Sequence, residues 1–231
     1  MPLQILVEDR LNEPYEILAR KALGLPVEQT NRREIRASVV QISELTSFEG
    51  LLNLVKTSQQ AGYDCIIFIV DEEITPASAD RPDRLSEFRQ AFTQLCDHLN
   101  ELLPQDPLNQ VNVIRIVSKR CLESWLATDP QAIIDAVRGK KGVNFNPPNR
   151  NTEDMSPQQA SEHIVHIIRE VGRQTGKRDL LQTRVRNVKR RGRSIALQLR
   201  IEQARRRNRS LAYFFDMVSC QRPGCEYPCP E

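Results

Sequence analysis

Hydrophobic residues in the first half of the chain form short runs that alternate with amphipathic segments. Four runs rich in β-branched residues predict strands, at residues 3–7, 35–42, 65–70 and 111–117. The segments between them have apolar residues three and four positions apart, as helices do, at residues 14–24, 47–61 and 85–103. This alternation predicts an α/β fold, with a parallel sheet of about four strands flanked by helices. The third run has no polar side, so we expect an interior strand that is buried on both faces.

The second half of the chain is predicted to be helical. Helical patterns cover residues 121–137, 158–172, 179–191, 194–207 and 210–218. A segment rich in Gly, Pro and Asn at residues 139–157 interrupts them and marks the best domain boundary. We therefore expect an α/β domain (1–138), a linker or loop (139–157), a basic helical extension (158–218) and a cysteine-containing tail (219–231).

Carboxylates follow two of the predicted strands directly. The first strand ends at Glu8 and Asp9, and the third ends at Asp71, Glu72 and Glu73. If the chain stays extended, Asp71 and Glu73 point the same way, and a bound cation or a shared proton usually relieves such repulsion. Parallel sheets place their ligands at this edge. The pattern predicts a metal site there, with loop residues or helix caps as the alternative.

The acids, together with two other segments, resemble a known family. An acid after the first strand and an Asp-x-acid pair after a later strand resemble the TOPRIM domain of topoisomerases, primases and overcoming-lysogenization-defect nucleases. More narrowly, the chain is similar to a TOPRIM-like prokaryotic family that is often encoded beside AAA-type ATPases in defence loci. The similar segments are residues 5–8, 67–73, 121–129 and 208–215, with Glu-Ser-Trp-Leu at 123–126 the most distinctive part. The chain departs from the family at two positions: Asp9 stands where Gly is usual, and Glu73 stands where the family has the second Asp of Asp-x-Asp.

The resemblance implies metal-dependent hydrolysis of phosphodiester bonds in DNA or RNA. Glu8, Asp71 and Glu73 would bind Mg²⁺ or Mn²⁺, hard cations that prefer oxygen ligands. Glu8 would serve as a ligand or as the general base, and Glu123 would complete the acidic cluster. The implied setting is anti-phage defence or genome maintenance with an AAA-type ATPase. That ATPase would be a separate chain, because this one has no Gly-x-x-x-x-Gly-Lys-[Ser/Thr] loop.

Other interpretations of these acids stay open. Glu123 is equally well an exposed helical acid or a partner of the helix dipole. Asp129, which precedes Pro130, is better explained as a helix N-cap than as a ligand. Asp9 and Glu73 keep open an alternative function, a catalytically degenerate nucleic-acid-binding or regulatory subunit of such an ATPase system.

The formal net charge of +3 conceals a strongly basic segment. Residues 176–209 contain 13 Lys or Arg residues against two acids, a local net charge of +11, which leaves −8 for the rest of the chain. Such a segment predicts contact with nucleic-acid phosphates, although an acidic protein partner fits the charge equally well. The expected contact residues are Arg184, Arg186, Lys189, Arg190, Arg191, Arg193, Arg205, Arg206 and Arg207. A homo-oligomer is also compatible with the sequence.

The cysteine tail and two histidines are weaker candidates. Cys220, Cys225 and Cys229 could bind zinc with a fourth ligand from elsewhere, or form a tail with free thiols. His163 and His166 share a helical face, as metal ligands can, although a partly buried or surface pair is the simpler interpretation. Because no segment is apolar enough to span a bilayer and residues 1–8 lack signal-peptide features, we expect a cytoplasmic protein without membrane contact.

Overall fold

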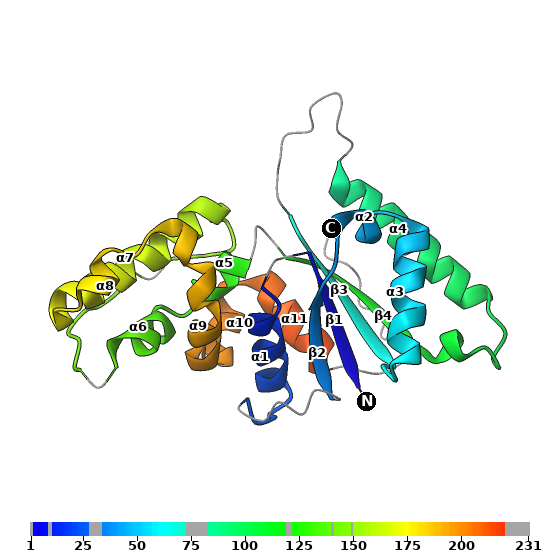
Figure 1. Cartoon of the computed structure of the whole chain (residues 1–231), viewed down its shortest axis with the longest axis horizontal. Coiled ribbons are helices and arrows are strands. Elements are labelled where there is room, and N and C mark those ends of the chain that lie inside the picture. The colour runs from blue at the N-terminus through cyan, green and yellow to red at the C-terminus, as the bar shows by residue number, and fades with distance from the viewer. Residues whose placement is uncertain are drawn as a thin grey trace.

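The computed structural model describes residues 2–8, 11–27, 34–72, 83–118, 122–139, 141–148 and 150–219. Its four strands are β1 (Leu3–Val7), β2 (Ile35–Val39), β3 (Cys65–Asp71) and β4 (Asn112–Ser118). They form one parallel sheet in the order β2-β1-β3-β4 (Figure 1). The predicted α/β class, with a four-stranded parallel sheet flanked by helices, is therefore confirmed. The apolar run Cys65–Val70 of β3 is fully buried, as expected for an interior strand.

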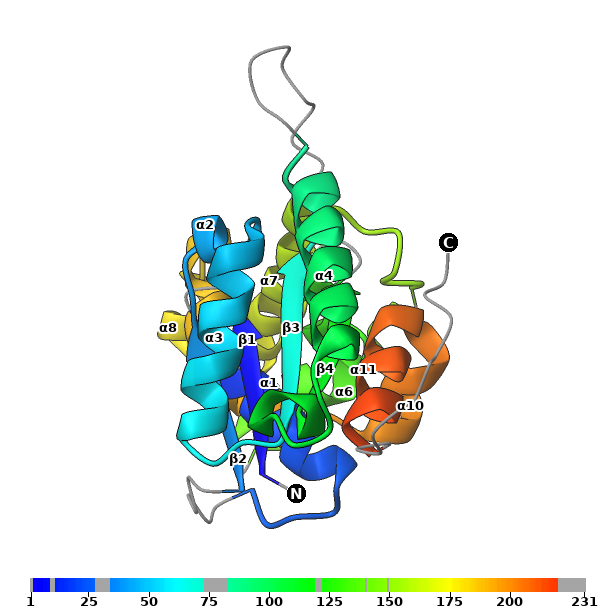
Figure 2. The same cartoon turned by 90° about the vertical axis from the view of Figure 1, so that its right-hand side faces the viewer.

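Helices cover both faces of the sheet. The first face packs against α3 (Phe48–Gln60) and α4 (Arg84–Glu101). In the chain, α2 (Ile42–Leu45) lies between β2 and α3, and a short 3₁₀ helix, η1 (Pro107–Gln110), lies between α4 and β4. The second face packs against α1 (Glu13–Ala22) and α11 (Arg209–Ser219). Strand side chains alternate between these faces, so that Leu6 and Phe68 contact the first group while Ile5 and Ile67 contact the second. Figure 1 shows the sheet between these two groups of helices, and Figure 2 shows the molecule from the side of α3 and α4.

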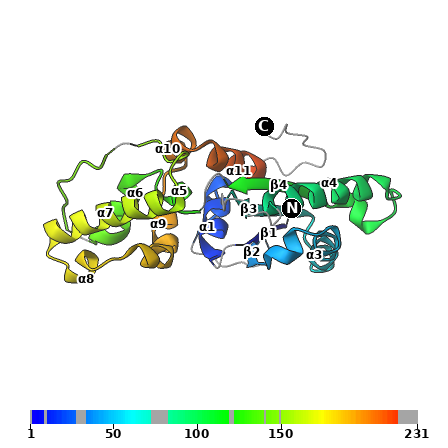
Figure 3. The same ribbon diagram turned by 90° about the horizontal axis from the view of Figure 1, so that it is seen from above.

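A second group of helices extends from the α1 side of the sheet. It consists of α5 (Leu122–Leu126), α6 (Pro130–Arg138), α7 (Pro157–Thr175), α8 (Arg178–Leu181), η2 (Val185–Asn187), η3 (Lys189–Arg191), α9 (Gly192–Gln198) and α10 (Ile201–Arg207). α6 packs on α7 and α9, and α9 packs on α1. Seen from above, this group lies at one end of the molecule and α3 and α4 lie at the other (Figure 3).

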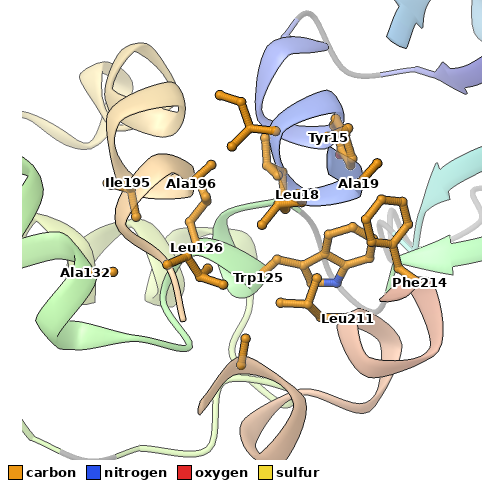
Figure 4. Close-up of a cluster of buried hydrophobic side chains, with 14 of the residues drawn as sticks. Tyr15, Leu18, Ala19, Trp125, Leu126, Ala132, Ile195, Ala196, Leu211 and Phe214 are labelled. Carbon is orange, nitrogen blue, oxygen red and sulfur yellow. The ribbon is translucent and has the colours of Figure 1, made fainter. Parts of the chain in front are cut away.

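The buried side chain of Trp125 joins this helical group to the sheet. Its ring lies 5.8 Å from that of Tyr15 on α1 and 5.2 Å from that of Phe214 on α11, measured between centroids (Figure 4). Its Nε1 donates a hydrogen bond of 2.8 Å to Ser210 Oγ. One hydrophobic cluster therefore contains residues from both sides of the predicted boundary at residue 138. That boundary stays a prediction, and residues 141–148 and 150–156 contain no helix or strand.

Local sequence explains where α7 begins and ends. Ser156 Oγ accepts a hydrogen bond from the backbone N–H of Gln159, whose side chain accepts one from the N–H of Ser156. This capping box, followed by Pro157 in the first turn, fixes the helix start. The helix ends at Gly176, whose φ of 70° is a conformation that glycine adopts without strain.

Candidate carboxylate centre and basic surface

Two of the predicted site residues lie at the carboxyl ends of the two central strands. Glu8 directly follows β1, Asp71 is the last residue of β3, and both are half-buried. β1 and β3 are parallel with Val7 level with Ile69, so the chain reaches Glu8 and Asp71 at the same edge of the sheet. This is the edge at which parallel sheets place their ligands.

Asp71 lies on the sheet face that α1 and α11 cover. Because side chains alternate along a strand, Asp71 shares a face with Ile67 and Ile69, which belong to the hydrophobic cluster of that face. Its partner on β4 is Ser118, which is buried and whose Oγ has no hydrogen-bond partner among the described residues. Ser118 is not among the site residues predicted from the sequence, although the alternation within β4 could have placed it beside Asp71.

Glu123 is a buried carboxylate in the segment that follows β4. It lies on α5, five residues after β4 ends, so the chain between Ser118 and Glu123 spans at most roughly 17 Å. Glu123 is 6% exposed, so its interpretation as an exposed helical acid is wrong. Its Oε1 lies 3.9 Å from Lys189 Nζ, and its Oε2 has no hydrogen-bond partner in the described part of the chain. A buried carboxylate oxygen without a partner is costly, and the ammonium group of Lys189 offsets part of that cost.

The described carboxylates do not by themselves make a complete metal site. Within the residue ranges described above, no three His, Cys, Asp or Glu side chains are grouped so that they could hold a metal ion. Glu73, the third predicted ligand, and Asp9 lie outside those ranges. Metal binding by Glu8, Asp71 and Glu73 therefore stays a prediction.

Asp129 has a structural partner in the basic segment. Its carboxylate caps α6 by accepting a hydrogen bond from the N–H of Ala132, which confirms the predicted N-cap. It also accepts bonds from the backbone N–H, Nε and Nη2 of Arg200, at 3.0, 2.8 and 2.7 Å. Burial on its own raises the pKa of the Asp129 carboxyl, but these hydrogen bonds and the charge of Arg200 outweigh it and lower that pKa from 3.8.

The predicted nucleic-acid contacts divide into paired and unpaired side chains. Four of them have no hydrogen-bond or ion-pair partner in the described ranges and are exposed: Arg184, Arg186, Arg190 and Arg206. Three others form ion pairs, namely Arg191 with Asp179 at 4.0 Å, Arg193 with Glu13 at 3.3 Å and Arg205 with Asp216 at 2.6 Å. Arg207 donates a hydrogen bond to the carbonyl oxygen of Thr128. The charge of this segment therefore serves the fold as well as its surface.

The remaining candidates are the two histidines and the cysteines. His163 is buried, and desolvation together with the charges of Arg150 and His166 lowers its pKa to about 4, so its ring is neutral at pH 7. His166 instead lies edge-on to Phe145. Of the cysteines, Cys65 is buried, which raises the pKa of its thiol to about 12 and makes it unreactive. The possible zinc ligands lie outside the described residues and are Cys220, Cys225 and Cys229.

Comparisons of this chain with protein-family models, curated proteins and solved structures give no match. In the described part of the structure, no helix combines the length and the apolar composition that crossing a bilayer requires.

Proposed function

We propose that this chain is a metal-dependent nuclease that hydrolyses phosphodiester bonds of DNA or RNA. The observation that carries the proposal is the buried Glu123 carboxylate, which has one unpartnered oxygen. It lies on α5, the helix that follows β4 in the chain, and β1 and β3 bring Glu8 and Asp71 to the same edge of the sheet. Buried acids with unmet electrostatic needs are typical of catalytic centres.

The donor chemistry at this edge suits Mg²⁺ or Mn²⁺. Carboxylate oxygens are the preferred protein ligands of both ions, and Glu8, Asp71 and Glu123 supply only such oxygens. When bound, the metal would offset negative charge on the phosphate and lower the pKa of the attacking water. Asp71 would hold the ion together with Glu73, the further ligand that the resemblance implies, and Glu123 would complete the acidic cluster. Glu8 would be a ligand or would accept the proton of the attacking water.

The basic segment supports a polyanionic substrate. Lys189 reaches Glu123 from η3, and Arg190 beside it is exposed and unpaired among the described residues. Cations next to an acidic centre favour binding of phosphate, which the carboxylates alone would repel. A separate AAA-type ATPase partner and a role in anti-phage defence or genome maintenance rest on the family resemblance alone.

A second candidate function is binding without chemistry, as a nucleic-acid-binding or regulatory subunit. It is favoured by the lack of a three-ligand metal cluster among the described residues and by the ion pair that Lys189 forms with Glu123. In this case the basic segment would retain its role and the carboxylates would be structural.

A cleavage assay in Mn²⁺ distinguishes the two functions. The substrates are plasmid, single-stranded DNA and RNA, and the proteins are the wild type, Glu8→Gln, Asp71→Asn and Glu123→Gln. The matched control is Glu162→Gln, which changes an exposed acid on α7. Loss of a general base lowers rates by about a hundredfold or more, so we expect the Glu8 variant to be nearly inactive. We also expect Asp71→Asn and Glu123→Gln to lose cleavage, and the control to remain active.

Two results would contradict the nuclease proposal. Cleavage that survives all three substitutions would place the activity elsewhere. Absence of cleavage under every condition, with or without an added ATPase partner, together with salt-sensitive binding of the same substrates, would establish the binding-subunit function.

A further inference from the structure

A basic cavity of about 620 Å³ lies where α10 meets α11. Its wall is formed by the end of α10, the start of α11 and the extended segment that precedes α7. The lining residues are Arg150, Asn151, Glu153, Gln203, Arg206, Arg207, Asn208 and Arg209. Its volume is in the range of small-molecule sites, which are typically about 300–1,000 Å³.

The lining of this cavity is strongly cationic. Four arginines stand against one carboxylate, that of Glu153, which gives a formal net charge of +3. The side chains of Arg206 and Arg209 are exposed and have no hydrogen-bond or ion-pair partner within the described ranges. Arg207 is oriented by its hydrogen bond from Nη1 to the carbonyl oxygen of Thr128, at 2.9 Å, and keeps other N–H groups for a ligand.

Asn208, which also lines the cavity, carries a buried side-chain donor. Its side chain is only 1% exposed, and its Oδ1 accepts hydrogen bonds from the N–H of Leu211 and from Ser210 Oγ, at 3.0 and 2.8 Å. The backbone N–H of Leu211 can only donate, so the side-chain atom of Asn208 that faces it must be the amide oxygen. The other terminal atom of the Asn208 amide is therefore the nitrogen. That nitrogen, Nδ2, is buried without a hydrogen-bond partner among the described residues. A buried amide donor without an acceptor indicates a missing anionic or polar ligand.

The backbone at the start of α11 also favours an anionic ligand. Asn208 caps the N-terminus of α11, a helix of 11 residues, and such termini carry partial positive charge. We propose that this cavity binds a phosphate monoester dianion, carried either by a free nucleotide or by the phosphorylated end of a nucleic-acid strand. The strand-end form rests on the proposed nuclease function, whereas the free-nucleotide form does not.

The choice of a monoester follows from charge and shape. A phosphodiester backbone presents one negative charge per phosphate and passes along an open surface. A terminal monoester presents nearly two charges at neutral pH and ends in the site. Four arginines and a buried amide in one concavity can satisfy several oxygens of a single group, and arginine pairs with phosphate through two parallel hydrogen bonds.

Calorimetric titration of the full chain in EDTA tests the proposal. The probes are 5′-AMP, inorganic phosphate and adenosine, followed by competition with one oligonucleotide carrying either a 5′-phosphate or a 5′-hydroxyl. We expect saturable binding of AMP and inorganic phosphate and none of adenosine. Preferential competition by the oligonucleotide with a 5′-phosphate would identify a strand end as a source, and competition by neither would identify the free nucleotide. Equal competition by both would show that the phosphodiester backbone binds and would overturn the choice of a monoester.

Variants locate the binding in the cavity. Arg206→Ala and Asn208→Ser should each weaken AMP binding about tenfold or more, the cost of a hydrogen bond to a charged group. Serine keeps the capping oxygen, so this variant is expected to fold. Glu153→Gln should tighten binding. The matched control Arg89→Ala, an exposed arginine on α4, should bind as the wild type does.

The proposal is overturned if AMP binds no better than adenosine, or if AMP binds Arg206→Ala and Asn208→Ser as tightly as the wild type. Asp71→Asn separates this site from the nuclease centre, because it should abolish cleavage and leave AMP binding unchanged. Cleavage without AMP binding would therefore refute the phosphate site alone, and AMP binding without cleavage would refute the nuclease alone.

Discussion

The pair formed by Asp129 and Arg200 allows a quantitative test of how the basic segment stabilises the fold. The perturbation is Arg200→Ala, which removes the Nε and Nη2 donors and leaves the backbone N–H bonds of Arg200 and Ala132 in place. Asp129 is fully buried, and removing one partner of a buried ion pair costs about 3–5 kcal/mol. The Arg200 side chain is 56% exposed, however, so water replaces part of the interaction, and exposed pairs contribute only about 1 kcal/mol. We expect a loss of about 2–3 kcal/mol in the free energy of unfolding at pH 7.

The contribution of the Asp129–Arg200 pair to stability should change with pH in a defined direction. The pKa of Asp129 is lowered in the folded protein, so its contribution to stability is present above the unfolded pKa and is lost as pH falls through the folded pKa. The difference between the wild type and Arg200→Ala should therefore shrink as the solution is acidified below the ordinary pKa of an aspartate. Arg200→Lys keeps the charge without the paired donors, so its free energy of unfolding should lie between those of the wild type and Arg200→Ala.

Urea unfolding followed by circular dichroism, at pH 7 and in acid, measures these differences. Arg186→Ala is the control, because this exposed arginine has no partner among the described residues and such changes stay within about 0.5 kcal/mol. The reasoning is refuted if Arg200→Ala unfolds like the control at pH 7, or if its deficit is the same at both pH values.

Three further predictions follow from the centre and the packing. Mn²⁺ should raise the melting temperature of the wild type and not that of Asp71→Asn, because a ligand that binds the native state stabilises that state. Thermal scans with and without EDTA check this. Glu123→Gln should lose cleavage and raise the free energy of unfolding by about 0–2 kcal/mol relative to the wild type, because the substitution removes a partly unsatisfied buried charge. A clear loss of stability in urea would contradict this. Gly172→Ala should destabilise the protein by about 1–3 kcal/mol in the same assay, despite the better helix propensity of alanine. Its new methyl group would lie 2.9 Å from Leu180 Cβ and 3.1 Å from the backbone N of Leu181, and a stability equal to that of the wild type would show that α8 moves freely.

The fold was predictable because its signals are local. The apolar run of β3 predicted a strand buried on both faces, and the structure places it between β1 and β4. The N-cap at Asp129 was equally visible, since Pro130 follows it and both prefer a helix start. Short-range pattern therefore suffices wherever one residue and its near neighbours decide the conformation.

The candidate site was less predictable because its contacts join distant parts of the chain. Asp129 meets Arg200 across 71 positions, and no local pattern pairs them. The burial of Glu123 was hidden for another reason: all five residues of α5 are buried, so this helix has no polar face from which exposure could be judged. Arg150 lies in the predicted linker and reaches the basic cavity only through the fold.

Charge counting likewise overstates the surface that is free for a ligand. Of the basic residues expected to contact nucleic acid, Arg193 and Arg205 are held by acids on α1 and α11, and Lys189 by Glu123. Substituting these residues changes helix packing and ligand binding together, so a loss of binding would have two explanations. Arg184, Arg186 and Arg190 are exposed without partners in the described structure, and their substitution leaves the fold intact. Salt-dependent binding lost in these variants would therefore reflect direct contact with phosphates rather than unfolding.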